Sequence, residues 1–144
     1  MFMGLFDNKS IDSKNRMFVP AKHRALLGEG CVITIGMEGC LCIYSLDEWQ
    51  LQSQKMEAIP QADLTARKFI RLVFSHAAKC EFDSQGRITI PENLKTFAHI
   101  DKDIVIMGVN TKIEVWAKER WEAPDNDSKY DPEEAAEALL KYNF

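Results

Sequence analysis

The sequence predicts an α+β protein with a mainly β core, in which two repeated units share one small closed β structure. The segment 11–20 returns as 82–91, with Asp, Ser, Arg and Pro recurring at an offset of 71 residues. The segment 32–36 returns as 104–108 at an offset of 72, so the two copies keep their register apart from one residue. Short β-branched segments around tight turns recur in both copies, which is typical of small closed sheets.

The length of the chain fits this organisation. A chain of 144 residues is one compact domain or two small fused ones, and each half alone would bury only a small core. We expect residues 1–77 to form the first unit with a helical connection, and residues 78–144 to form the second unit with a C-terminal helical tail. Both units are expected to build one shared barrel.

The first unit begins with a strand that leads into a tight turn. In this turn Asp12 can bond its own downstream backbone, and Asn15 tolerates a positive φ. Pro20 suits the first turn of a helix, and Gly28 is typical of a helix end. The elements expected here are the strands Met3–Ile11 and Met17–Val19, the helix Ala21–Leu27, the hairpin strands Cys31–Met37 and Cys40–Tyr44, and the helices Ser45–Met56 and Leu64–Ala77.

The second unit repeats this order of elements. Gly86 stands at the turn position of Asn15, and both residue types fit a left-handed conformation there. A polar stretch, Ala123–Tyr130, precedes a final acidic helix. The elements expected in this unit are the strands Cys80–Asp83 and Ile88–Ile90, the helix Glu92–Ala98, the hairpin strands Ile104–Val109 and Lys112–Trp116, and the helices Ala117–Glu122 and Pro132–Tyr142.

The helix expected over Leu64–Ala77 has two unlike sides. Its apolar residues form a loose stripe, made up of Leu64, Phe69, Leu72, Val73 and Phe74. Three cations lie on its other side, namely Arg67, Lys68 and Arg71. This basic side predicts a solvated face or a subunit interface.

Charge is unevenly distributed along the chain. The net charge is −4, which does not by itself indicate a nucleic-acid partner. However, residues 9–24 carry five lysines and arginines against one acid, and residues 67–95 carry six against three. Residues 122–144 carry seven acids against two lysines. The local field at the repeated turns is therefore more positive than the overall charge suggests.

Nothing in the sequence indicates an enzyme or a bound cofactor. The histidines are scattered, and there is no phosphate-binding glycine loop or catalytic signature. Cys40 and Cys42 alternate on a strand, and with His76 or Cys80 they could be imagined around a metal ion. The paired Cys-x-x-Cys spacing of such sites is absent, so buried thiols are the better interpretation.

The chain also lacks the patterns of membrane and secreted proteins. No apolar run approaches the ~18 residues of a membrane span. The first ten residues have no long apolar stretch and do not resemble a secretory signal. We therefore expect a cytoplasmic protein without a membrane partner.

The repeated turn carries a resemblance to a known family. Its Asp-x-x-x-Arg pattern, followed by an apolar triplet and proline, resembles the MraZ family of bacterial transcriptional regulators in both copies. The resemblance extends from Met1 to about Trp121. Segments after each turn agree with it, namely 39–44, 47–49, 113–116 and 118–121. The chain departs from the family pattern with Asn15 in place of a common glycine, and with Gln85 in place of a lysine. His23 stands where an aromatic residue is frequent.

The resemblance implies a fold, a partner and an assembly. It implies a double-split β-barrel of the AbrB/SpoVT kind with swapped hairpins, built from two tandem repeats with flanking helices. It further implies a cytoplasmic, nucleoid-associated protein that forms ring-shaped homo-oligomers, an octamer being one such size. Members bind direct repeats in the promoter of the division and cell-wall gene cluster, mainly as repressors. Their Asp-x-x-x-Arg loops face double-stranded DNA.

Carried over to this chain, the resemblance makes Arg16 and Arg87 the principal DNA contacts, with Lys14 as a basic companion. An arginine at the tip of a rigid turn can bond two acceptors at once, on phosphate or on guanine. The remaining candidate residues shape the turns or bond phosphate: Asp12, Asp83, Ser13 and Ser84. The structural alternative is that both arginines brace their turns through the aspartates, and the two roles can coexist.

Lys14 is either a phosphate contact or a solvated lysine. Lys9, Lys22 and Arg24 are interpreted as plain surface charges in preference to the alternative, a contact with DNA. One pair of turns carries few cations, so a single chain should bind DNA weakly. An assembly that engages successive repeats gains avidity, by ~10²–10⁴-fold. Two other functions stay open: an antitoxin-like module, since this barrel also serves in toxin–antitoxin pairs, and a scaffold ring that does not bind DNA.

Overall fold

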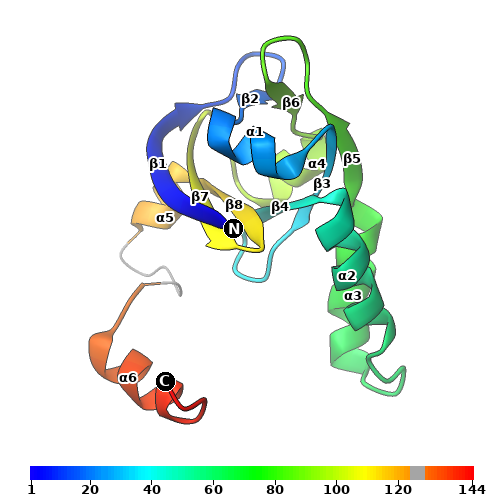
Figure 1. The fold of residues 1–144 in the computed structure, drawn as a ribbon, viewed down its shortest axis with the longest axis vertical. Coiled ribbons are helices and arrows are strands. Elements are labelled where there is room, and N and C mark those ends of the chain that lie inside the picture. Colours follow the sequence, from blue (N-terminus) through cyan, green and yellow to red (C-terminus); the bar gives the residue numbers. More distant parts are fainter. Residues whose placement is uncertain (124–128) are drawn as a thin grey trace.

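The computed structural model describes residues 1–123 and 129–144, so most of the polar stretch before the last helix lies outside the described residues. The described chain is a mixed α+β fold around a mainly β core (Figure 1), as the sequence predicts. Its strands are β1 (Phe2–Ser10), β2 (Arg16–Phe18), β3 (Gly30–Ile35), β4 (Leu41–Ser45), β5 (Ala78–Glu81), β6 (Arg87–Thr89), β7 (Asp103–Asn110) and β8 (Lys112–Ala117). Its helices are α1 (Ala21–Leu27), α2 (Leu46–Glu57), α3 (Leu64–His76), α4 (Glu92–Phe97), α5 (Lys118–Glu122) and α6 (Pro132–Leu140).

The two repeats exchange their first strands. The main sheet is antiparallel, with the strand order β1-β7-β8-β4-β3-β5. Strand β1 of the first repeat pairs with β7 of the second repeat, whereas β5 of the second repeat pairs with β3 of the first. Strands β4 and β8 meet in the middle, where Ile43 lies opposite Ile113. Each repeat therefore completes the sheet of the other.

A second, two-stranded ribbon closes this sheet. It consists of β2 and β6, which pair antiparallel with Met17 opposite Ile88. In Figure 1, β1 and β5 run up the two flanks of the barrel and lead into this ribbon at the top. The side chains of Met17 and Ile88 are buried in the same apolar cluster as Ile33 and Ile106 of the main sheet. One core thus contains side chains of both repeats.

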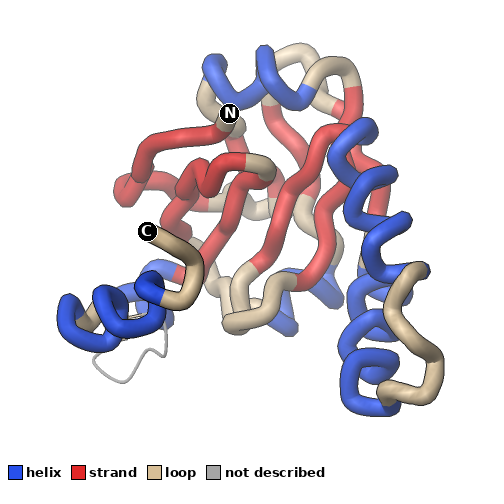
Figure 2. The backbone as a smooth tube through the Cα atoms, turned by 60° about the horizontal axis from the view of Figure 1, so that its bottom comes forward, coloured by secondary structure: helices blue, strands red, loops and turns tan. Residues whose placement is uncertain are grey.

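The helices surround this core, and α1, α3 and α4 contribute Leu27, Val73 and Leu94 to it. Helix α1 begins after Pro20 and stops at Gly28, whose φ is +78°, as the sequence predicts. Helices α2 and α3 stand side by side against one flank of the barrel in Figures 1 and 2. The apolar stripe expected on α3 is mostly open: Val73 is its one buried residue, and Leu64, Leu72 and Phe74 are exposed.

The four cysteines are buried free thiols, as the sequence predicts. Cys31 lies opposite Cys80 in the β3–β5 pair. Cys40 and Cys42 both lie beside Gly36. Within residues 1–123 and 129–144, no group of three or more histidines, cysteines and acids is placed to hold a metal ion. None of the described helices combines the length and the apolar character that crossing a membrane requires.

Candidate nucleic-acid interface

The first Asp-x-x-x-Arg turn is organised by the side chain of Asp12. Its Oδ1 accepts hydrogen bonds from the backbone N–H groups of Lys14 and Arg16, both over 2.9 Å. Its Oδ2 accepts from Nε of Arg16 over 2.7 Å. Asn15 takes a φ of +60°, the left-handed conformation predicted for this position. One carboxylate thus fixes both the backbone of the turn and the direction of its arginine.

The second turn reproduces this geometry. Oδ1 of Asp83 accepts from the N–H groups of Gln85 and Arg87 over 2.9 Å, and Oδ2 accepts from Nε of Arg87 over 2.8 Å. Gly86 has a φ of +76° at the position of Asn15. The turns differ in charge, because Lys14 in the first is replaced by Gln85 in the second.

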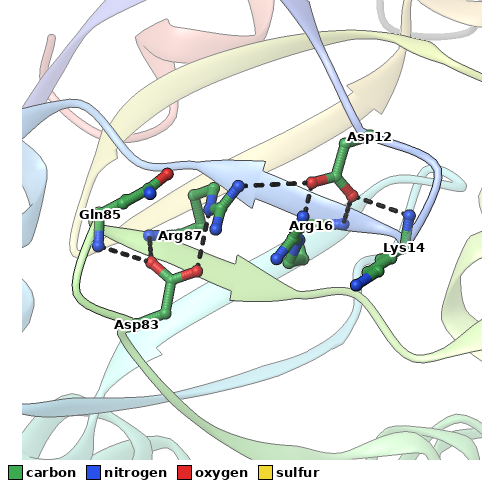
Figure 3. Close-up of polar contacts among 6 residues, drawn as sticks. All are labelled: Asp12, Lys14, Arg16, Asp83, Gln85 and Arg87. Carbon is green, nitrogen blue, oxygen red and sulfur yellow. Dashed lines mark hydrogen bonds and ion pairs between the residues drawn. The ribbon is translucent and has the colours of Figure 1, made fainter.

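The two turns lie next to each other on the β2–β6 ribbon. Figure 3 shows the arginines and aspartates of both repeats gathered over these two short strands. Nη1 of Arg87 approaches Oδ2 of Asp12 to 3.7 Å, so Asp12 lies between the arginines of both repeats. The antiparallel pairing of Arg16 with Thr89 and of Phe18 with Arg87 produces this arrangement. The fold therefore brings together residues that are 71 positions apart in the chain.

Hydrogen bonding controls the ionisation of both carboxylates. The bond from the backbone N–H of Arg16, more than any other contact, lowers the pKa of Asp12 below its ordinary value of 3.8. The N–H of Arg87 has the same effect on the pKa of Asp83. Both aspartates are therefore ionised at neutral pH. Together with Lys14, the surface carries three cations against two carboxylates.

The arginines are partly accessible. The side chain of Arg16 is 30% exposed and that of Arg87 is 24% exposed. Each Nε donates a hydrogen bond to the aspartate of the same turn, so the arginines do brace their turns, as the structural alternative expects. The guanidinium groups nevertheless reach the surface and are not enclosed in the barrel. Ser13, Lys14 and Ser84 are exposed at the tips of the turns.

Each turn is also held by the other repeat. Nζ of Lys95, on α4, donates to Oδ1 of Asn15 over 3.1 Å. Nδ2 of Asn15 donates to Oε2 of Glu92 over 2.8 Å. The backbone N–H of Ile90 donates to the carbonyl of Asn15 over 2.7 Å. The first turn is thus anchored on the second repeat.

The second turn is anchored on the first repeat in the same way. The N–H of Val19 donates to the carbonyl of Gly86 over 3.1 Å. Arg24, on α1, donates from Nη1 to the carbonyl of Val19 over 3.1 Å, and its guanidinium lies 5.0 Å from the ring centre of Phe18. This guanidinium fills the space that a Cβ atom on Gly86 would need.

Sequence reasoning missed this cross-repeat anchoring. It treated Arg24 as a plain surface charge and assigned no role to Lys95 or Glu92. The repeat itself contained a usable signal, because Arg24 and Lys95 occupy equivalent positions at the offset of 71 residues. Lys9 and Lys22, also interpreted as surface charges, lie over the rings of Phe18 and Phe6, at 5.7 and 5.3 Å.

Comparison with known proteins agrees with this duplicated geometry. A family described as "MraZ protein, putative antitoxin-like" matches the chain twice, over residues 1–72 and 73–143. The chain belongs to the MraZ family. Both MraZ repeats thus contain one Asp-x-x-x-Arg turn each, and the resemblance seen in the sequence is confirmed.

Several curated MraZ proteins match over nearly the whole chain. One from Pelotomaculum thermopropionicum is 44% identical over 144 residues, covering 100% of this chain and 99% of the relative. One from Caldanaerobacter subterraneus is 43% identical and covers 100% of both chains. One from Alkaliphilus metalliredigens is 41% identical over 139 residues, or 96% of both. Each of these relatives is named "Transcriptional regulator MraZ".

Proposed function

We propose that this chain is a sequence-specific, DNA-binding transcriptional regulator that contacts double-stranded DNA through its two Asp-x-x-x-Arg turns. The observation that carries the proposal is the pairing of both turns on one ribbon, with Arg16 and Arg87 partly exposed side by side. The names of the MraZ relatives support the regulatory role, which belongs to a non-enzymatic class.

The hydrogen bonds of the turns suggest how the arginines act. Asp12 and Asp83 accept hydrogen bonds from the Nε atoms of Arg16 and Arg87. These bonds fix the orientation of each guanidinium and therefore the direction of its terminal nitrogens. A planar fork of this kind can bond two phosphate oxygens, or O6 and N7 of guanine. Lys14, Ser13 and Ser84 surround the arginines and can bond the phosphate backbone.

The small number of cations makes assembly part of the proposal. Three cations accompanied by two carboxylates give a single chain weak attraction to DNA. A homo-oligomeric ring that presents several ribbons to successive direct repeats gains effective concentration at each further contact. Following the family resemblance, we further propose that the protein acts in the cytoplasm at the nucleoid, as a repressor bound to direct repeats upstream of the division and cell-wall gene cluster.

The test is footprinting and gel-shift titration on the DNA upstream of the protein's own gene, at several salt concentrations. Arg16→Gln and Arg87→Gln are each compared with Lys55→Gln, a loss of one exposed cation on α2, away from the ribbon. We expect each ribbon variant to bind at least about tenfold more weakly. Protection of evenly spaced repeats and a steep salt slope are expected for the wild type.

Two outcomes would contradict the proposal. Unchanged affinity in the double variant Arg16→Gln with Arg87→Gln would remove the turns from the interface. Absence of any specific DNA binding by an intact assembly would favour the scaffold alternative. The family description contains the words "antitoxin-like", which correspond to the other alternative, an antitoxin-like module. Co-purification of a small protein partner would support that alternative.

A further inference from the structure

Among the described residues, helix α6 lies away from the rest of the fold. In Figures 1 and 2 it stands apart from the barrel and from the α2–α3 pair. It is nine residues long, and Asp131 caps it by accepting a 2.9 Å hydrogen bond from the N–H of Glu133. The large apolar side chains of its end are open: Leu140 is 74%, Tyr142 77% and Phe144 90% exposed. An isolated helix this short is marginal in water, so packing must supply its stability.

The repeat explains why α6 lacks a partner. The second family match extends to residue 143 and includes α6, as the first match includes the beginning of α3. Helix α3 packs beside the 12-residue α2, with Trp49 and Phe74 in contact at 5.4 Å between ring centres. The counterpart of α2 is α5, which has only five residues. Within the described residues, the second repeat therefore has no long inner helix for α6 to pack against.

A complementary surface is found on α3. Its side facing away from the barrel carries Arg67, Lys68 and Arg71, and α3 contains no acidic residue. Leu64 and Leu72 lie among these cations and are 64% and 43% exposed. We call these five residues the α3 surface. Exposed leucines mixed with cations are suited to an amphipathic segment of opposite charge.

The charges of α6 match this surface. Glu133 and Glu137 are one helical turn apart, as are Arg67 and Arg71, so two parallel or antiparallel helices can align both pairs about 6 Å apart. We propose that α6 and the residues after it dock on the α3 surface of a second copy of this chain. The contact rests on the assembly part of the proposed function and is independent of DNA binding by the turns.

Such a contact can link many chains. The docking segment and the α3 surface are different parts of the molecule, so every chain offers one of each. Contacts of this heterologous kind build closed rings when the rotation between neighbours closes, and open filaments when it does not. The contact uses no residue of the β2–β6 ribbon, because neither α3 nor α6 contributes to it.

The experiment uses charge reversal in the full-length protein and measures molar mass by light scattering over a range of concentrations. Variant one is Arg67→Glu with Arg71→Glu, and variant two is Glu133→Lys with Glu137→Lys. The control matched to variant two, Glu119→Lys with Glu122→Lys, makes the same change of charge on α5. We expect the midpoint of assembly to rise at least about tenfold in both variants but not in the control.

Mixing the two variants makes the test specific. In an equimolar mixture each α6 meets an α3 surface of opposite charge on the other variant, so the mass should return to the wild-type value. Three results would overturn the proposal: wild-type mass in either variant, a wild-type chain that stays monomeric throughout, or rescue only when all four changes are in one chain. The last result would mean that α6 docks on its own α3. Because none of these readouts involves DNA, failure of the DNA-binding proposal would be seen separately.

Discussion

Lys95 of the second repeat donates a hydrogen bond of 3.1 Å to the side chain of Asn15, at the tip of the first repeat's turn. Arg24 of the first repeat lies in the same way against Gly86 in the turn of the second. Neither Asp-x-x-x-Arg turn is therefore supported by its own repeat alone. A disturbance of one short helix is expected to reach the turn of the other repeat.

Substitutions of Asn15 separate the backbone of the turn from its anchoring. Asn15→Gly keeps the left-handed conformation and loses the bonds to Lys95 and Glu92, whereas Asn15→Ala also places an alanine at a φ of +60°. We expect the alanine variant to be less stable than the glycine variant by about 1 kcal/mol, measured by urea unfolding. Equal stability of the two variants would show that the turn can change its conformation freely.

Gly86→Ala tests the space occupied by Arg24. A Cβ atom at Gly86 meets the guanidinium of Arg24, and the φ of +76° is strained for alanine. We expect a lower melting temperature, with partial recovery in the double variant Gly86→Ala with Arg24→Ala, because the collision is removed and the backbone strain remains. A double variant no more stable than Gly86→Ala would mean that the guanidinium moves aside without cost.

The two aspartates should respond differently to neutralisation. Asp12 contacts Arg16 and Arg87, whereas Asp83 is paired with Arg87. Asp12→Asn should therefore lower the unfolding midpoint more than Asp83→Asn at pH 7. Since both pKa values are lowered in the folded state, this stabilisation is complete above about pH 3.8 and is lost as the pH falls through the folded values. Urea titrations at pH 7 and at a series of pH values below 3.8 should show the difference shrinking as the pH falls.

His23 is expected to make the fold sensitive to acid. It is fully buried between the rings of Phe2 and Phe6, and among the described residues its ring nitrogens have no hydrogen-bond partner. Burial, and then the charge of Lys22, lowers the pKa of His23 below its ordinary 6.5. As the pH falls below 6.5, His23 is therefore protonated in the unfolded chain before it is protonated in the folded chain. The free energy of unfolding decreases as a result.

His23→Phe keeps an aromatic ring at this position and removes the proton. Between pH 6.5 and 5 we expect the wild type to lose up to about 1 kcal/mol per pH unit more than the variant. Chemical unfolding at a series of pH values measures this slope. Parallel slopes for the two proteins would show that His23 is protonated inside the fold.

Local signals in the sequence were sufficient for the elements of the fold. Pro20 and Gly28 delimit α1 at the predicted residues, and the predicted strand around Met17 differs from β2 by one residue at each end. The left-handed positions of Asn15 and Gly86 also follow from residue type. These features depend on neighbours in the chain, which is why a single sequence contains them.

Pairing between distant segments was harder to predict from the sequence. Nothing in the alternation of β1 indicates that it joins β7 instead of its own hairpin, and the resemblance to a family was needed to expect an exchange. The salt bridge between Arg87 and Asp12 and the bond between Lys95 and Asn15 depend on another distant pairing, that of β2 with β6. The open stripe of α3 is a similar case, because amphipathicity shows that a helix has an apolar side but not what covers it.

The unlike tips of the two turns have a consequence for the molecule as a whole. The two turns have matching hydrogen bonds and lie on antiparallel strands, but Gln85 of the second stands at the position of Lys14 in the first. The binding face thus has a polarity, with a more cationic end and a more neutral one. Such a face can distinguish the two directions along a ligand that has a direction, such as a direct repeat in the proposed DNA partner. Copies bound to successive repeats would then all have the same orientation.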